Sequence, residues 1–206
     1  MRARWIPARL PIRWSLVVAS LLVLAVIVWL RRSEPGFADK LAPFVLEGRM
    51  EQRVEARNFA VYVKRIKLAE AYLTEGAGFG GKPRRVAGDG IWMSALVEVE
   101  PLQEPGYVSA WLRTADGRDY VGAPQDRPKV RGVNLGEQEL ATGLLASGAY
   151  FFDVPADALQ GAHLRFFWGM SKPGDMDHII DIDLQLDPEA VHKLRTEAVP
   201  MIDLTP

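Results

Sequence analysis

An apolar run, WSLVVASLLVLAVIVWL, occupies residues 14–30 and contains no charged side chain. Its 17 residues are close to the shortest helix that crosses the hydrocarbon core of a bilayer, for which about 20 residues are typical. Trp14 and Trp29 stand at its two ends, where the amphipathic indole ring favours the membrane interface. We therefore expect a transmembrane anchor over residues 14–30.

The flanking arginines predict the orientation of this anchor. Four precede it and two follow it, and Glu34 and Asp39 dilute the second group. Because positively charged flanks stay on the cytoplasmic side, residues 1–13 are expected in the cytoplasm and the C-terminal part in the periplasm or outside the cell. The residues expected at the membrane interface are Trp14, Trp29, Arg13, Arg31 and Arg32.

Two other interpretations of the run remain open, a cleaved signal peptide and a buried helix of a soluble protein. The apolar region is long for a signal peptide, and no A-x-A cleavage site follows Leu30. An uncleaved anchor is therefore favoured. Residues 31–43, punctuated by Pro and Gly, are interpreted as a linker.

The rest of the chain is acidic and contains no cysteine. Residues 1–32 hold six arginines and no acid, which leaves 19 basic residues against 26 acidic ones. Such a domain is a poor candidate for nucleic acid, whose phosphates require clustered Lys and Arg. Disulfides, thiol catalysis and attachment of a bacterial lipid anchor are excluded for this chain because each needs cysteine.

Alternation of apolar and polar residues dominates after the linker. Phe59, Val61 and Val63 lie on one face of a predicted strand, and the alternation shifts phase at Arg65, which indicates a β-bulge. Asp116-Gly117 indicates a hairpin turn. Further strands are expected over residues 91–100, 107–114, 119–122, 149–154, 162–168 and 180–186.

Many short strands separated by Gly and Pro turns favour a β-sandwich or a barrel, which we assign to residues 44–187. Asp187 is expected to cap a helix that begins at Pro188 and ends before Pro200. Residues 188–206 are therefore interpreted as a C-terminal helix and tail.

The stretch EGAGFGGKPRR, residues 75–85, matches parts of two nucleotide-binding motifs. G-x-G-x-x-G needs a helix that opens at its third glycine, but Gly88 and Gly90 follow too soon. G-x-x-x-x-G-K needs Ser or Thr after the lysine, where this chain has Pro83. We expect a connection between two strands, with no bound nucleotide and no cofactor.

The densest group of acidic residues is DMDHIIDID, residues 175–183. Carboxylates suit calcium and imidazole suits zinc. Asp181 and Asp183 alternate with apolar residues, however, as on the solvated face of a strand. We predict no metal ligand and no catalytic residue, because His163, His192 and the serines lack the context of a triad or a nucleophile elbow.

Three aromatic residues, Trp92, Phe151 and Phe167, are expected to point away from the main core. They either pack under loops, under the C-terminal helix or in a second layer, or form an exposed apolar patch that binds a partner. The candidate interaction site combines this patch with the basic residues of the glycine-rich loop. Its members are Trp92, Phe151, Phe167, Lys82, Arg84 and Arg85.

Three stretches carry a resemblance to a known group of proteins: NFAVYVKRIKLAEAYL, GDGIWMSALVEVE and YFFDVPADALQGAHLRF. They resemble bacterial immunoglobulin-like domains that follow single membrane anchors or lipid anchors in extracytoplasmic proteins of unknown function. The resemblance covers roughly residues 45–186. It implies an immunoglobulin-like antiparallel β-sandwich with a binding or structural role and no catalytic residues. The lipid-anchor cysteine of such proteins is absent here, and the C-terminal helix is additional.

We therefore expect a non-catalytic, single-pass membrane protein. Its extracytoplasmic domain would dock to another envelope protein or serve as an accessory subunit of a membrane complex. The alternative is an extracytoplasmic ligand-binding or sensor domain for a metal or a small anion, and a hydrolase is the third hypothesis.

Overall fold

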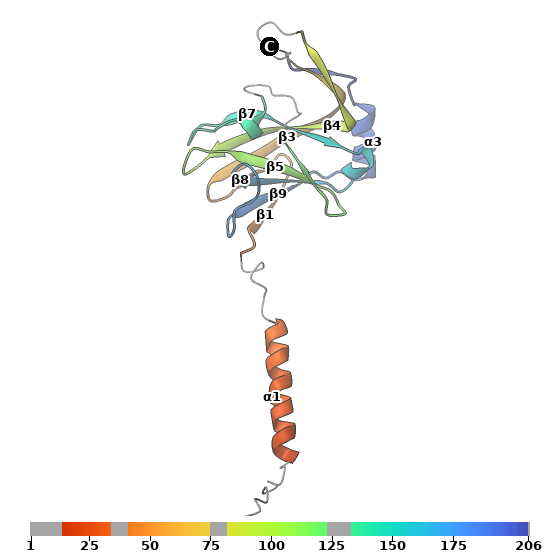
Figure 1. Cartoon of the computed structure of the whole chain (residues 1–206). Coiled ribbons are helices and arrows are strands. Elements are labelled where there is room, and N and C mark those ends of the chain that lie inside the picture. Colours follow the sequence, from red (N-terminus) through yellow and green to blue (C-terminus); the bar gives the residue numbers. More distant parts are fainter. Residues whose placement is uncertain (1–13, 34–40, 75–81, 123–132, 206) are drawn as a thin grey trace, which may run out of the picture. The chain divides into compact units, whose positions relative to one another are not determined.

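The computed structural model describes residues 14–33, 41–74, 82–122 and 133–205. The chain divides into two compact units, Met1–Leu41 and Ala42–Pro206. All of the expected cytoplasmic segment (residues 1–13), most of the linker, and the glycines at positions 76–81 lie outside the described residues. Figure 1 follows the two units along the chain.

The N-terminal unit contains one helix, α1 (Trp14–Ser33), which begins where the apolar run begins and extends three residues beyond its end. Its described side chains, from Trp14 to Arg32, are all exposed. Arg31 and Arg32 lie in the last turn, where positive charge interacts favourably with the helix dipole. By length and composition alone, α1 qualifies as a membrane span or as a signal anchor.

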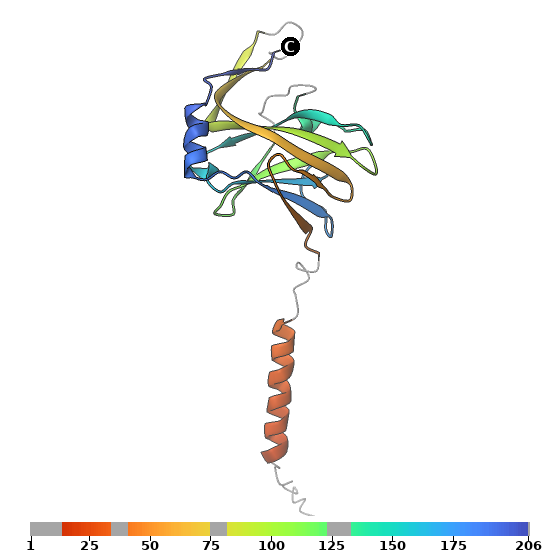
Figure 2. The ribbon, with the colours of Figure 1, turned by 180° about the vertical axis from the view of Figure 1, so that it is seen from behind.

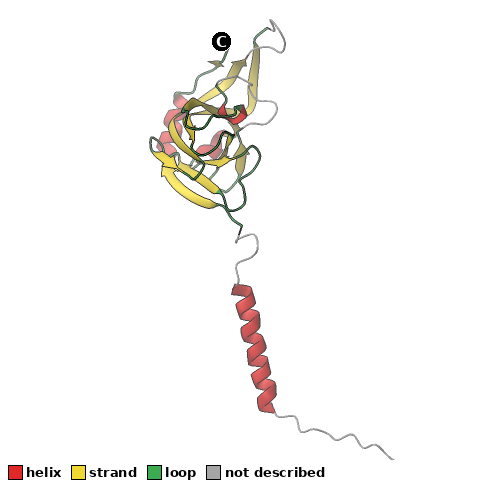
Figure 3. Ribbon diagram, turned by 90° about the vertical axis from the view of Figure 1, so that its left-hand side faces the viewer, coloured by secondary structure: helices red, strands yellow, loops and turns green. Residues whose placement is uncertain are grey.

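The second unit is a β-sandwich of two sheets. Sheet A has the strand order β1-β9-β8-β5-β6, and sheet B has the order β10-β3-β4-β7, with β2 also paired to β3. Strands are the main secondary structure of this unit, as the colouring in Figure 3 shows. The strands are β1 (Phe44–Arg49), β2 (Arg53–Glu55), β3 (Phe59–Thr74), β4 (Arg84–Pro101), β5 (Val108–Arg113), β6 (Asp119–Val121), β7 (Ala146–Val154), β8 (His163–Trp168), β9 (His178–Asp183) and β10 (Ile202–Asp203).

Two strand pairs correct the expectation of a purely antiparallel sandwich. β1 pairs with β9 in parallel, with Phe44 opposite His178, and β10 pairs in parallel with β3. Alternation has the same period in parallel and antiparallel strands, so the sequence pattern carries no information about strand direction. Long connections separate both pairs along the chain, as parallel pairing requires.

The main core lies between the two sheets, and its strand faces match the predicted alternation. Met93, Ala95, Val97 and Val99 of β4 are all fully buried. The predicted bulge is confirmed, because the β3–β4 register shifts between Val63 and Arg65. The predicted hairpin turn is also confirmed, with Gly117 in a left-handed conformation at φ 84°.

The C-terminal helix is confirmed as α3 (Pro188–Thr196), seen in blue at one end of the sandwich in Figure 2. The Asp187 carboxylate accepts a 2.8 Å hydrogen bond from the Ala190 amide, which satisfies one of the free donors of the first turn. Val191 is buried against the core and Leu194 packs beside it. Two short 3-10 helices, η1 (Leu135–Glu137) and η2 (Ala156–Leu159), complete the unit.

The glycine-rich stretch connects β3 to β4, as expected. Thr74 and Arg84, at its two ends, face each other in an antiparallel hairpin, so a strand and not a helix follows the glycines. Gly88 and Gly90 belong to β4, and the reason for glycine there is close packing. A Cβ at Gly90 would meet the backbone carbonyl of Val154, and one at Gly88 would meet the Asp153 carboxylate.

Candidate functional site

The outer face of sheet A carries a row of charged side chains. Ile182 and Leu164 point into the core, so their neighbours along the strands point outward. The parallel β1–β9 register places Glu47 beside Asp181, and the β8–β9 hairpin places Arg165 on the other side of Asp181. The next row, two residues further along the strands, consists of Arg49, Asp183, His163, Arg113 and Asp119.

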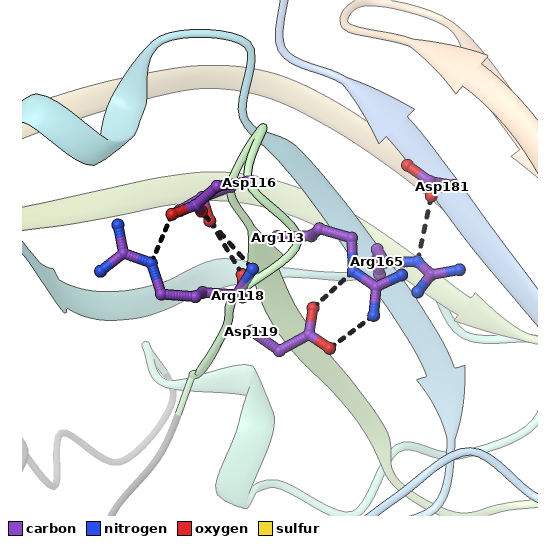
Figure 4. A network of polar contacts seen from close by, with 7 residues as sticks. Arg113, Asp116, Arg118, Asp119, Arg165 and Asp181 are labelled. Atoms are coloured by element: carbon purple, nitrogen blue, oxygen red, sulfur yellow. Dashed lines mark hydrogen bonds and ion pairs between the residues drawn. The ribbon is translucent and has the colours of Figure 1, made fainter.

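Asp181 is the centre of this arrangement. His163 Nδ1 lies 2.8 Å from Asp181 Oδ1, within hydrogen-bond distance. Arg165 Nε lies 3.0 Å from Asp181 Oδ2, an ion pair whose N–H direction does not complete a hydrogen bond. The side chains of Arg165 and Asp181 are only 12% and 16% exposed, so this contact is less screened by water than an ordinary surface ion pair. Figure 4 shows the two side chains facing each other across β8 and β9.

A second ion pair extends the row towards the edge of sheet A. Arg113 donates from Nε and Nη2 to the two carboxylate oxygens of Asp119, at 2.7 and 2.6 Å. This bidentate contact is the main reason that the pKa of Arg113 is raised above its ordinary value, so the guanidinium stays charged. At the β5–β6 turn, the Thr114 hydroxyl and Arg118 hold the pKa of Asp116 below its usual range. Both pairs are visible in Figure 4.

A cavity of about 430 Å³ lies beside Asp181. Its lining includes acidic, basic and amide side chains but few apolar atoms, so it suits a small polar molecule or a polar segment of a partner. His163 and Asp181, whose side chains lie within hydrogen-bond distance of each other, both line it. The lining residues are Glu47, Gly48, Arg49, Gln52, His163, Asp181 and Asp183.

The acidic stretch at residues 175–183 is divided between two places. Asp181 and Asp183 line the cavity, whereas Asp177 forms an ion pair with Arg57 at 3.2 Å. The His178 ring packs in a tilted arrangement against the ring of Phe44, with 5.6 Å between the ring centres. Within the described parts of the chain, no group of three His, Cys, Asp or Glu side chains is placed to hold a metal ion.

Of the two sequence interpretations of the three aromatic residues, the exposed patch is wrong. Trp92 and Phe151 are 3% and 1% exposed, because they form a second core on the outer face of sheet B. Both pack against Tyr72, whose ring centre lies 5.2 Å from that of Trp92 and 5.1 Å from that of Phe151. Val133 and the C-terminal residues Ile202 and Leu204 pack over this second core. Such packing in a second layer was the other sequence interpretation.

Phe167 is also buried, at 1% exposed, although it lies on the outer face of sheet A. Its ring packs edge to face against Trp111 on the neighbouring strand, with 4.9 Å between the ring centres. A cross-strand aromatic pair of this kind stabilises the sheet and leaves little of Phe167 for a partner.

The basic residues of the predicted site are accessible. Lys82 precedes β4, Arg84 and Arg85 begin it, and all three are exposed. Their contact with an anionic partner remains a prediction.

The sequence interpretation missed the residues that surround Asp181. The sequence pattern alone assigns His163 no partner, whereas the β8–β9 register sets it opposite Asp183 and diagonally beside Asp181. Glu47 and Arg49 were missed because their position depends on the parallel pairing of β1 with β9. The register of the β8–β9 hairpin was a usable signal, whereas the β1 pairing was not.

Comparisons with known proteins add little to this description. No family model matches the chain. No curated protein matches it either. Among solved structures, an uncharacterized β-sandwich protein from Clostridium difficile 630 is similar at 9% identity and a TM-score of 0.40, over 72% of this chain and 99% of that one.

Two further solved structures are similar at the same level. The yjhA protein from Bacillus subtilis has 12% identity and a TM-score of 0.43, over 66% of this chain and 99% of that one. The secreted protein MPT63 from Mycobacterium tuberculosis has 16% identity and a TM-score of 0.42, over 68% of this chain and 98% of that one. These similarities carry no inference about function.

Proposed function

We propose that this chain is a single-pass membrane protein without catalytic activity. Its β-sandwich, of immunoglobulin-like type, would lie outside the cytoplasm and dock to another envelope protein or serve as an accessory subunit of a membrane complex. The observation that carries the proposal is the composition of α1, which has 17 uncharged, mostly apolar residues from Trp14 to Leu30 and apolar side chains on every side of the helix. A helix of that composition is stable only inside a bilayer or against other apolar surface.

The charges at the two ends of the anchor support the proposed orientation. Arg31 and Arg32 follow it, and Arg2, Arg4, Arg9 and Arg13 precede it. The more basic flank stays in the cytoplasm, which leaves the β-sandwich in the periplasm or outside the cell.

The outer face of sheet A is the docking surface that we propose in place of the aromatic patch. It presents both signs of charge, in a cavity that can accept a polar side chain or loop from a partner. Complementary charges of this kind give specificity and rapid association more than they give affinity. Lys82, Arg84 and Arg85 offer a second, basic contact.

In-cell crosslinking tests the docking surface directly. A photoreactive residue would replace Glu47, which lines the cavity, or Arg84, and Gln160 on the same domain is the exposed control. A single protein captured from Glu47 but not from Gln160 is the expected result. Purification of the full chain with no stoichiometric partner, and no capture from either test position, would contradict the docking role.

A ligand-binding or sensor role is the second candidate, and the His163–Asp181 pair in the cavity favours it. A ligand that binds only the native state raises the melting temperature. Calcium, zinc and phosphate are the probes, and each is compared in the full chain with the variant Asp181→Asn. A rise in melting temperature that Asp181→Asn abolishes would favour ligand binding over docking.

A further inference from the structure

The exposed large apolar side chains of the β-sandwich are unevenly distributed. Most lie at one end, where β1, β5 and β9 begin and β4 and β8 finish; we call this the Phe44 end. The pairing of Phe44 with His178 and of Val108 with Trp168 defines it within sheet A. The exposed apolar residues of the described chain at this end are Phe44, Val45, Val121, Leu144, Leu145, Met170 and Met176.

Sheet B reaches the same end. Phe59, the first residue of β3, stacks on Trp168 of sheet A with 6.3 Å between the ring centres. Phe59 also pairs with Pro101, the last residue of β4, and the loop before β7 joins there through the bond from the Gly143 amide to the Pro101 carbonyl. Leu144 and Leu145 therefore belong to the Phe44 end.

The opposite end is more polar. There the β5–β6 turn carries Asp116 and Arg118, and α3 presents exposed charged residues to solvent. Two exposed apolar side chains, Val199 and Met201, lie on that side in the described chain, beside the far end of β3. The apolar surface is thus concentrated where the chain enters the domain.

The turn between β8 and β9 holds Met176 in a backbone conformation that costs energy. Met176 is 53% exposed and has φ 54°, a left-handed conformation that Gly or Asn adopts more easily. The turn is tied to the start of β1, because the Phe44 amide donates a 2.7 Å hydrogen bond to the Asp177 carbonyl. Phe44 itself is 55% exposed. Both side chains are thus more than half exposed, although the Phe44 ring contacts that of His178.

The chain between α1 and β1 limits which surface can lie against the membrane. Eleven peptide units separate Ser33 from Phe44. Fully extended, they span at most about 40 Å, and any shorter path brings Phe44 closer to the end of the anchor. Phe44 is therefore held within about 40 Å of the end of α1, which gives the Phe44 end a high effective concentration at the lipid surface.

We propose that the Phe44 end rests in the lipid headgroup region, with Phe44, Met170 and Met176 inserted among the headgroups. The inference rests on the proposed membrane anchor. Aromatic and methionine side chains gain free energy on leaving water for the interface. The same turn carries exposed Lys172 and exposed Asp175. Lys172 can extend to lipid phosphates, and Arg57 offsets the charge of Asp177. The membrane thus limits how the domain presents its docking surface.

Because the chain contains no cysteine, single labels can test this contact in the full-length protein. Met176→Cys carries an environment-sensitive fluorophore at the Phe44 end. Met201→Cys is the matched control, an exposed methionine at the opposite end. Leu22→Cys reports on the anchor itself. Each protein is reconstituted into vesicles of phosphatidylcholine and phosphatidylglycerol, with and without nitroxide-labelled headgroups that quench nearby fluorophores.

We expect headgroup nitroxides to quench the Met176 label severalfold more than the Met201 label. Adding Phe44→Glu to Met176→Cys should reduce quenching to the level of the control, because a charge replaces an interfacial ring. Equal quenching at Met176 and Met201, with Leu22 fully protected from aqueous quenchers, would overturn the lipid contact and leave the anchor intact. A Leu22 label that aqueous quenchers reach would overturn the anchor and the contact together.

Discussion

The hydroxyl of Tyr150 donates a 2.7 Å hydrogen bond to the backbone carbonyl of Val108. Tyr150 belongs to β7 in sheet B and Val108 to β5 in sheet A, so this bond crosses the core and joins the two sheets. Tyr150 is 1% exposed, and its burial raises the pKa of the phenol above its ordinary value. A buried hydroxyl of this kind must keep both its proton and its acceptor.

Replacing Tyr150 by Phe should therefore lower the free energy of unfolding by about 1–2 kcal/mol at neutral pH, because the Val108 carbonyl loses its cross-sheet donor. Since the pKa of Tyr150 is raised in the folded state, its contribution is complete below the unfolded pKa and decreases above about pH 10. The difference between wild type and Tyr150→Phe should shrink at that pH. Urea unfolding of the full chain in mild detergent measures it, and a constant difference would contradict the assignment.

Asp187→Ala tests the cap of α3. The carboxylate accepts from the Ala190 amide, so its loss should cost about 1 kcal/mol of unfolding free energy. Glu189→Ala, an exposed substitution in the first turn of the same helix, is the control and should cost less. Denaturant unfolding distinguishes the two. Equal effects would mean that charge near the helix start, and not the cap, stabilises α3.

The strand faces and the helix cap could be predicted because both depend on neighbours in the sequence. The alternation at Met93, Ala95 and Val97 reflects a strand with one face in a core, whatever its partner. Asp187 and Pro188 act within one turn of helix. Local chemistry of this kind needs no knowledge of topology.

The second core and the cavity depend on contacts between distant segments. Alternation predicts one buried face for each strand, so it places Trp92 and Phe151 on the other face. That face is also covered, by a second core. The residues that cover them include Ile202, more than 50 positions away from Phe151 in the chain. In the same way, Glu47 reaches the cavity only through the parallel pairing of β1 with β9. No periodic pattern encodes such docking.

Phe151→Ala should destabilise the domain and not merely weaken binding. The ring is fully buried against Tyr72, so truncation leaves a cavity and should cost about 3–5 kcal/mol. Leu144→Ala is the control, because Leu144 is 65% exposed and its loss should change the unfolding free energy by at most about 0.5 kcal/mol. Thermal or urea unfolding of both variants decides the matter. If the Phe151→Ala protein were as stable as Leu144→Ala, the result would support the hypothesis of an exposed aromatic patch.

Asp181→Ala should show whether the charged row on sheet A is held together by one carboxylate. The substitution removes the hydrogen-bond partner of His163. It also removes the carboxylate that lies beside the mostly buried guanidinium of Arg165. We expect a loss of about 1–3 kcal/mol of unfolding free energy, since a charged group keeps its desolvation cost when its partner is lost. Urea unfolding of the full chain measures this loss.

Glu47→Ala is the matched control for Asp181→Ala. Glu47 lies directly beside Asp181 in the parallel register and lines the same cavity, but it is exposed on the strand at the edge of sheet A. Its removal takes away the same charge and should cost less than about 1 kcal/mol. If both variants lose the same stability, the net charge of the cavity is responsible. If Asp181→Ala alone is destabilised, the contacts of Asp181 with His163 and Arg165 hold this part of sheet A together, and with it the cavity that we propose as a docking surface.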